Sequence, residues 1–172
     1  MEKYFLQTIA MPIIDHSGQK IGRVGDVILN TEKGKIVGFL VGPAKKKAIA
    51  AIDVEMWNQA IRVNDSGDII DLNEVQEIAH ALEKDIQIFK NRVVTKKGDY
   101  IGKVVDFGMD NSHFRLTCLI VAKSFLGIIF WDKRIIAAQD IVKIEKKQIT
   151  VKNLVKPVKM KKLRVKMATP NL

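Results

Sequence analysis

The sequence is poor in cysteine, proline and aromatic residues. Of its 172 residues one is cysteine (Cys118), four are proline, and 6% are aromatic. A single cysteine excludes an intrachain disulfide framework, and its place in an apolar stretch predicts an inert core thiol. No run of 18 apolar residues is present, and residues 1–11 lack the pattern of a signal peptide. We therefore expect a cytoplasmic protein.

The motifs of common catalytic and metal sites are also absent. No nucleophile elbow, Walker loop, Cys-x-x-Cys or His-Glu-x-x-His pattern occurs. None of the three histidines has a metal-ligating neighbour at a suitable spacing. A loop beginning at Asp65 has Gln76 at its twelfth position, where a calcium-binding EF-hand needs glutamate. We therefore expect no enzymatic activity, no cofactor and no bound metal.

The sequence contains instead an internal repeat. Residues 18–27 read GQKIGRVGDV, and residues 98–107 read GDYIGKVVDF. The correspondence continues without a gap to residues 41 and 121. After an insertion of about seven residues in the second copy, residues 49–54 match residues 136–141. Such repetition predicts two units of like fold.

The repeated residues have types that suit turns and strands. Gly18 and Gly98 follow polar residues between apolar runs, where a tight hairpin needs positive φ. Gly22 and Gly102 lie inside strands rich in β-branched residues, which is typical of a bulge or a barrel corner. Aspartates occur near the strand ends at positions that correspond in the two copies, and we interpret them as structural: Asp26, Asp53, Asp106 and Asp140.

These residues form the pattern G-x-x-[IL]-G-x-V-x-D, a turn, an apolar strand and Ile-x-x-x-Asp-[VI], which resembles the PRC-barrel family. Two departures are that alanine stands where proline is frequent before Asp53 and Asp140, and that Phe114 replaces the turn glycine Gly34. The resemblance implies small closed or partly closed β-barrels without catalytic activity. The family includes the cytoplasmic domain of the photosynthetic reaction-centre H subunit and the C-terminal domain of a ribosome maturation factor.

The expected fold is mainly β, with two PRC-type barrels in tandem. We expect the first strand of barrel one over residues 4–11, and a linker helix over about 73–84, capped by Asp71 or Asn73. Three lysines at 45–47 form a basic loop in the first copy, which is either a solvated loop or a phosphate contact. The predicted domains are a first barrel (1–70), a linker helix (71–85), a second barrel (86–153) and a basic tail (154–172).

The insertion in the second barrel reads FLGIIFW over residues 125–131. One interpretation is an additional core strand. The other is an exposed edge that binds a partner, because large exposed apolar patches mark interaction sites. The candidate partner-binding residues are Phe125, Ile128, Phe130 and Trp131.

Positive charge is concentrated at the end of the chain. Residues 143–172 hold ten of the 29 basic residues and one of the 19 acidic residues, so nine of the ten net charges fall there. Pro157 blocks one continuous helix through the tail. The tail is either a solvated segment or an arm that binds phosphates of RNA or of anionic lipid. The candidate polyanion-binding residues are Lys156, Lys159, Lys161, Lys162, Arg164 and Lys166.

The leading functional hypothesis is a non-enzymatic scaffold that binds a protein partner and mediates macromolecular assembly. A ribosome-maturation role with direct RNA contact is the first alternative, although the family's maturation factor has a different N-terminal barrel. Peripheral attachment to an anionic membrane surface is the second alternative. A second copy of the chain is a further candidate partner. The sequence does not choose among these partners.

Overall fold

The computed structural model describes residues 1–125 and 129–153, with the side chains of residues 125 and 129–131 outside the description. Residues 126–128 and the predicted basic tail, 154–172, also lie outside it.

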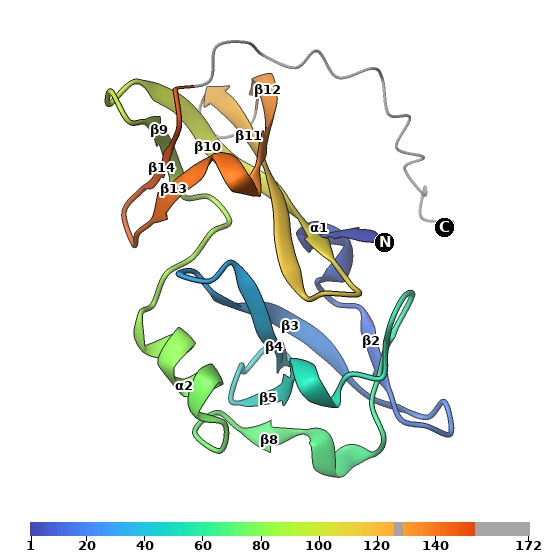
Figure 1. Ribbon diagram of the computed structural model, residues 1–172. Coiled ribbons are helices and arrows are strands. Elements are labelled where there is room, and N and C mark those ends of the chain that lie inside the picture. Colours follow the sequence, from blue (N-terminus) through green and yellow to red (C-terminus); the bar gives the residue numbers. More distant parts are fainter. Residues whose placement is uncertain (126–128, 154–172) are drawn as a thin grey trace, which may run out of the picture.

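The described chain is mainly β (Figure 1). The first barrel contains β2 (Pro12–Ile14), β3 (Lys20–Asn30), β4 (Lys35–Val41), β5 (Lys47–Ala50), η1 (Ala51–Asp53), β6 (Met56–Trp57), β7 (Ile61–Arg62), η2 (Ser66–Asp68) and β8 (Ile70–Asp71). The second contains β9 (Arg92–Thr95), β10 (Tyr100–Asp110), β11 (Arg115–Phe125), β12 (Ile129–Ala137), η3 (Ala138–Asp140), β13 (Ile141–Ile144) and β14 (Ile149–Val151).

The two barrels have the same strand register at corresponding positions of the repeat. In the β3–β4 hairpin Val24 pairs with Val41, and in the β10–β11 hairpin the equivalent residues, Val104 and Val121, are paired. A bulge follows each of these pairs. Each barrel also contains one parallel pair, β2 with β7 and β9 with β14. The prediction of two like β-barrels in tandem is confirmed.

The barrels join through the tips of their long hairpins. Arg115 of β11 pairs with Lys35 of β4. The Ile36 N–H donates to the Phe114 carbonyl at 2.7 Å, and the Leu116 N–H donates to the Gly34 carbonyl at 2.9 Å. Ile36 and Leu116 are equivalent positions of the repeat, and so are Gly34 and Phe114. The two hydrogen bonds are therefore equivalent, and the junction has local two-fold symmetry. It links the strands into one sheet that curls through both barrels.

The first segment of the chain lies on the second barrel, so the expected strand over residues 4–11 of barrel one is wrong. Its strand is β1 (Glu2–Tyr4), which pairs with β10, and it continues into α1 (Phe5–Thr8). Both Phe5 and Thr8 are buried, at the spacing of one helical face. The Leu6 N–H donates to the Asp106 carboxylate at 3.1 Å, which satisfies one free donor of the helix. We call residues 1–8 the N-terminal arm.

The linker helix α2 (Gln76–Glu83) is shorter than expected. Asp71 and Asn73 do not cap it, and its N-cap residue, Val75, makes no side-chain capping bond. Instead the Asp71 N–H donates to the Glu74 carboxylate at 2.7 Å, which forms a turn before the helix. Ile78 of α2 is fully buried in a cluster with residues of β3, β4 and β5. The helix therefore packs on the first barrel, whereas the arm packs on the second.

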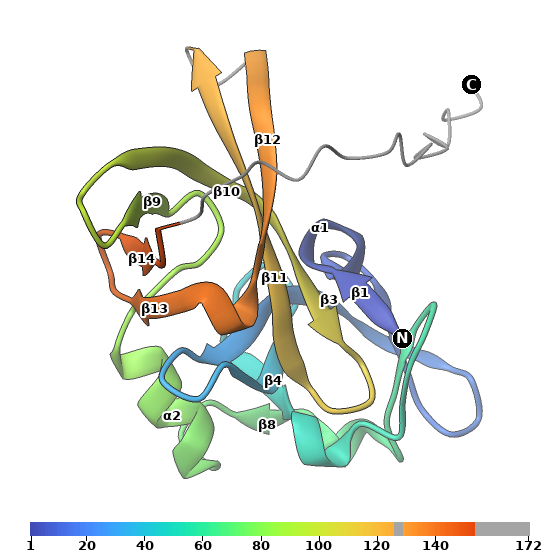
Figure 2. The same ribbon diagram turned by 45° about the horizontal axis from the view of Figure 1, so that its top comes forward.

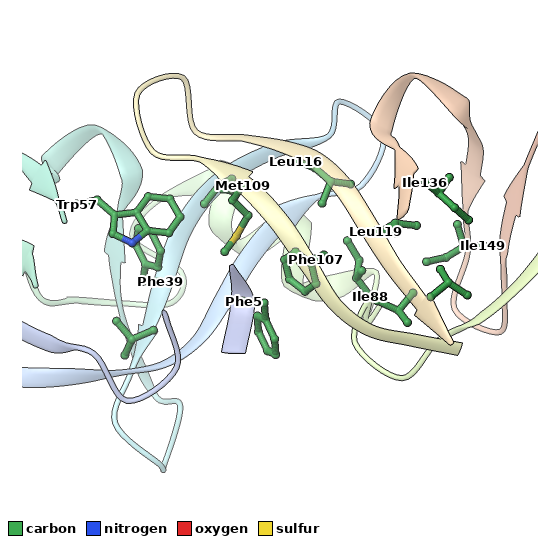
Figure 3. Close-up of a cluster of buried hydrophobic side chains, with 14 of the residues drawn as sticks. Phe5, Phe39, Trp57, Ile88, Phe107, Met109, Leu116, Leu119, Ile136 and Ile149 are labelled. Carbon is green, nitrogen blue, oxygen red and sulfur yellow. The ribbon is translucent and has the colours of Figure 1, made fainter. Parts of the chain in front are cut away.

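One hydrophobic core extends through both barrels (Figure 3). Phe39 and Trp57 of the first barrel form an edge-to-face pair with ring centroids 4.9 Å apart, and Trp57 lies 5.7 Å from Phe114 of the second. Phe5 of the arm stacks on Phe107 at 4.6 Å. Aromatic side chains therefore make the core continuous across the junction. Each barrel buries apolar surface of the other that would be exposed in an isolated barrel.

The two interior glycines of the repeat lie in different surroundings, and this predicts unequal effects of substitution. Gly102 has φ +154°, and a Cβ there would lie 2.5 Å from the Ala122 carbonyl oxygen. At Gly22 the nearest atom would be a Val41 methyl at 3.1 Å. We expect Gly102→Val to lower the free energy of unfolding by about 3 kcal/mol and Gly22→Val by about 1 kcal/mol. Urea midpoints of the two variants measure this difference, and equal losses would contradict it.

Candidate functional site

The repeated motif residues do not meet in one site. Gly18 and Gly98 close the turns before β3 and β10 with φ of +87° and +89°. Asp53 lies in η1 and Asp140 in η3, at corresponding corners of the two barrels. Burial raises the pKa of the Asp53 carboxyl. These residues are distributed over both barrels and are held by local contacts, which is consistent with structural roles.

Asp26 and Asp106 occupy the same bulge in the two copies but bind different groups. Asp26 accepts from the Lys45 ammonium at 2.6 Å and from the next N–H of its own strand at 2.9 Å. Asp106 accepts from the next N–H at 2.9 Å and from Leu6 of the arm. Burial raises the pKa of Asp106, although these backbone bonds favour the carboxylate. Asp26 therefore fixes the lysine loop, and Asp106 fixes the arm.

The lysine loop of the first copy is partly neutralised by this contact. Lys45 pairs with Asp26, and Lys47 pairs with Asp71 of β8 at 2.9 Å. Two of the three lysines therefore hold the loop against its own barrel, which favours a structural role for them over phosphate binding.

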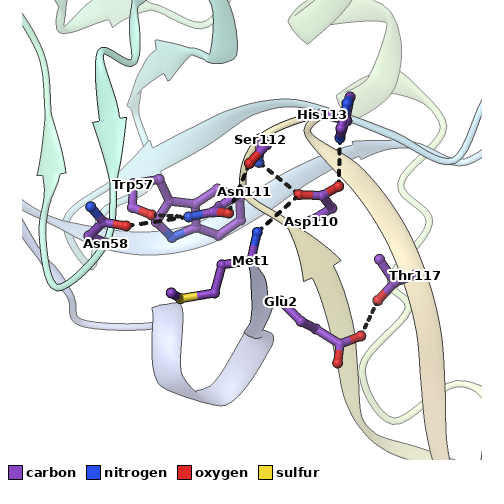
Figure 4. A network of polar contacts seen from close by, with 9 residues as sticks. All are labelled: Met1, Glu2, Trp57, Asn58, Asp110, Asn111, Ser112, His113 and Thr117. Atoms are coloured by element: carbon purple, nitrogen blue, oxygen red, sulfur yellow. Dashed lines mark hydrogen bonds and ion pairs between the residues drawn. The ribbon is translucent and has the colours of Figure 1, made fainter.

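The N-terminal arm, the β6–β7 hairpin and the β10–β11 turn form a polar network (Figure 4). The Asn111 side-chain amide donates to the Trp57 carbonyl at 2.6 Å, which ties the turn to the first barrel. On the other side of the turn, the Thr117 hydroxyl donates to the Glu2 carboxylate at 2.6 Å. The arm is therefore fixed by polar contacts as well as by its pairing with β10.

Two titratable groups of this network, Asp110 and Tyr4, have pKa values far from neutral pH. The hydrogen bond from His113 and the N–H of Ser112 lower the pKa of Asp110 to about 2. Burial and the hydrogen bond to Glu2 raise the pKa of Tyr4 to about 12. Efficient general acids and bases have pKa values near the working pH. Asp110 is ionised and Tyr4 is neutral at pH 7, so both act here as fixed hydrogen-bonding groups.

A groove of about 650 Å³ lies between the arm and the β6–β7 hairpin, and we call it the arm groove. Three side chains at paired positions of neighbouring strands line it, Ile14 of β2, Arg62 of β7 and Met56 of β6. The arm contributes Lys3, whose ammonium donates to the Asn58 carbonyl at 2.9 Å. The lining residues are Met1, Lys3, Ile14, Met56, Asn58, Gln59, Ala60 and Arg62.

A second groove, of about 510 Å³, lies between the linker and β13, and we call it the linker groove. Its lining includes the segment before the second barrel and the strand after η3, which correspond to the arm and to β6, and also the β3–β4 turn, whose counterpart in the second copy does not line the arm groove. Its lysines are paired: Lys84 with Glu32 and Lys143 with Glu145, both at 2.6 Å, and Lys146 with Asp85 of the neighbouring linker. The lining residues are Thr31, Glu32, Lys84, Ile86, Val142, Lys143, Ile144, Glu145 and Lys146.

The candidate partner-binding segment lies at the end of the β11–β12 hairpin. The last pair between β10 and β11 is Lys103 with Ala122, but β11 and β12 continue to pair as far as Phe125 with Ile129. Figure 2 shows this hairpin extending beyond the rest of the second barrel. Ile128 and the side chains of Phe125, Phe130 and Trp131 lie outside the described residues. Their assignment to core or interface therefore stays a prediction.

The candidate polyanion-binding residues of the tail also lie outside the described residues. Of the basic residues just before them, Lys143 and Lys146 are paired as described above, and Lys152 lies 3.4 Å from the Asp140 carboxylate. The excess positive charge of the C-terminal region therefore belongs mainly to residues 154–172.

Sequence reasoning missed the arm groove and the position of Arg62 in its lining. The groove depends on the arm crossing to the second barrel, for which residues 1–8 give no local signal. Within the described ranges, no group of three His, Cys, Asp or Glu side chains could hold a metal ion. None of the helices described there is long and apolar enough to cross a membrane.

Comparison with known families agrees with the repeat. The model of the PRC-barrel domain matches the chain twice, over residues 2–75 and 87–156. The two matches start near the same point of the two copies and together cover most of the sequence. No curated protein matches the chain.

Proposed function

The chain belongs to the PRC-barrel family, and on that premise we propose that it is a non-catalytic module that binds a protein partner and supports the assembly of a larger complex. PRC-barrel domains generally serve as interaction modules rather than as enzymes. The proposal includes a cytoplasmic location, with a membrane surface as the alternative place of action.

The observation that carries this proposal is the extended β11–β12 hairpin. Its counterpart in the first copy, β4–β5, ends at the lysine loop, which ion pairs hold against its own barrel. The second copy extends further and has the sequence FLGIIFW where its strands meet. An apolar segment on an extended hairpin suits a protein contact, because a protein partner can remove its apolar surface from water.

The charge of the barrels favours a protein partner over a polyanion for this part of the chain. Residues 1–153, which include both barrels, carry a net charge of +4, and the remaining +6 falls in the tail of 19 residues. Nucleic acids and anionic membranes attract proteins chiefly through clustered basic residues. The barrels are therefore the proposed protein-binding part.

We expect Phe125→Ser combined with Ile128→Ser to abolish partner binding or self-association without changing the melting temperature. The matched control is Ala44→Ser with Lys46→Ser in the corresponding loop of the first copy. Sedimentation measures self-association, and affinity capture from native lysate measures partner binding. Loss of folding in the hairpin variant alone would contradict the proposal and favour a core strand.

Polyanion binding by the tail is the second candidate function. Residues 154–172 contain six basic residues and no acidic residue. This composition supports contact with phosphates of RNA, as in a ribosome-maturation role, or of anionic lipids. The tail contains no aromatic residue, which disfavours recognition of single-stranded bases by stacking.

A further inference from the structure

We propose that the arm groove binds an acidic peptide segment of a protein partner, with Arg62 and Lys3 contacting its carboxylates. The inference rests on the proposed function, since it names the chemistry of a protein contact. It concerns a surface separate from the β11–β12 hairpin, so failure of peptide binding at the groove can be distinguished from failure of partner binding at the hairpin.

The first argument is the environment of Arg62. Its side chain lies on the outer face of β7, because the neighbouring Ile61 and its partner Ile13 are fully buried in the core on the opposite face. The Nε atom of Arg62 is buried and has no hydrogen-bond partner among the described residues. The described chain also supplies no acidic group within ion-pair distance of its guanidinium.

The buried Nε is covered by the protein itself, so a ligand in the groove meets the terminal N–H groups of the guanidinium; a carboxylate there compensates a charge that has no acidic partner in the described chain. The guanidinium presents parallel N–H groups that match the two oxygens of a carboxylate. Lys3 supplies a second positive charge, and no acidic residue lines the arm groove. The groove is therefore electrostatically complementary to an acidic ligand.

The second argument is the contrast between the two grooves. In the linker groove each lysine is paired with a carboxylate of the same chain, as described above. The position that corresponds to Arg62 is Thr150, since Arg62 pairs with Ile14 and Thr150 pairs with Val94. The linker groove thus neutralises its own charge, whereas the arm groove retains two cations without acidic partners in the described chain.

The third argument concerns the type of ligand. Apolar side chains surround the two cations: Met1, Ile14, Met56 and Ala60. Methionine side chains adapt to irregular apolar shapes, so the groove would accommodate a peptide in which an apolar residue stands beside each acidic residue. No aromatic residue lines the groove for base stacking, which argues against RNA.

The test uses full-length protein with methionine methyl groups labelled for NMR. The probe is the acetylated, amidated peptide Leu-Glu-Leu-Glu-Leu, with Leu-Gln-Leu-Gln-Leu and Leu-Lys-Leu-Lys-Leu as matched controls. We expect the acidic peptide to shift the Met56 methyl signal and the Arg62 Nε–H signal in a saturable manner. The neutral and basic peptides should bind at least about ten-fold more weakly, because they lack the charge-assisted bonds.

Variants separate the groove from general attraction by the basic tail. Arg62→Gln should weaken the acidic peptide at least about ten-fold, and Arg62→Lys should weaken it less, because the charge remains but the paired donors are lost. Lys3→Gln should weaken it about two- to five-fold. Lys143→Gln, in the linker groove, removes the same charge and should leave binding within about two-fold. Amide spectra show whether each variant is folded. If Arg62→Gln does not fold, the peptide affinities of Lys3→Gln and Arg62→Lys test the proposal instead.

Three results would overturn the proposal. The first is a Met56 response of equal size to the acidic and neutral peptides. The second is acidic-peptide binding that Arg62→Lys and Lys3→Gln leave unchanged, which would assign the binding to the tail. The third is a stronger response of Met56 and Arg62 to a uridine hexanucleotide than to the peptide, which would assign the groove to nucleic acid.

Discussion

Phe5→Ala is expected to lower the free energy of unfolding of the whole chain by about 3–5 kcal/mol. Phe5 is only 8% exposed, stacks on Phe107 at 4.6 Å and lies 5.2 Å from Phe89. The substitution removes an aromatic ring from a core shared by both barrels and leaves a cavity where the arm meets the second barrel. Because that core is continuous, urea should unfold the variant in a single transition at a lower midpoint.

Leu6→Ala is the matched control for this prediction. Leu6 follows Phe5 in the same helix but is 53% exposed, so its loss should cost less than about 1 kcal/mol. Equal losses for the two variants would mean that the arm is not part of the core. Two separate urea transitions in Phe5→Ala would mean that the arm only joins two independently stable barrels.

Features that depend on local sequence could be predicted. The repeat indicated the number of barrels, and its ungapped correspondence is preserved in the register of both long hairpins. The turns at Gly18 and Gly98 were expected because glycine adopts positive φ easily there, and both adopt it. The register of a hairpin is set by the pattern of apolar side chains along its strands and by its turn residues. Both can be read from a single sequence.

Features that depend on distant contacts could not be predicted. Phe5 and Leu6 suit a strand as well as a helix, and they form α1 because Asp106, 100 positions away, accepts the Leu6 N–H. Phe114 adopts φ +50° without being glycine, at the position of Gly34 in the first copy. Its contact with Trp57 lies across the junction, so no local pattern reports it. The arm groove is hidden in the sequence for the same reason.

The repeat makes the arm groove recognisable once the structure is known. Each copy serves as a reference for the other: the lysines of the linker groove and two lysines of the 45–47 loop each have a carboxylate beside them. Arg62 is a difference without such compensation in the described chain. The groove and the tail are both basic, and an acidic partner would be attracted to both, so experiments on one must control for the other.

Removal of the tail should have the largest effect on polyanion affinity. Residues 154–172 carry six basic residues, and each phosphate contact steepens the dependence of log K on log salt by close to one unit. If all six bind, deletion should reduce this slope by about 4–5 units and the affinity at low salt by about a thousand-fold. The melting temperature should change little, because the described core ends at Val151.

A full-length variant with all six basic residues changed to glutamine separates charge from chain length. It should behave like the deletion toward both a single-stranded RNA and anionic vesicles, since in either case phosphates are the proposed contact. The matched control changes Lys33, Lys96 and Lys97, which lie in turns of the two barrels, to glutamine and should keep the slope of the natural chain. A slope that the tail variants leave unchanged would mean that the tail charge only solvates the segment. A reduced slope with RNA but not with vesicles would select the ribosome-maturation alternative, and the reverse would select the membrane surface.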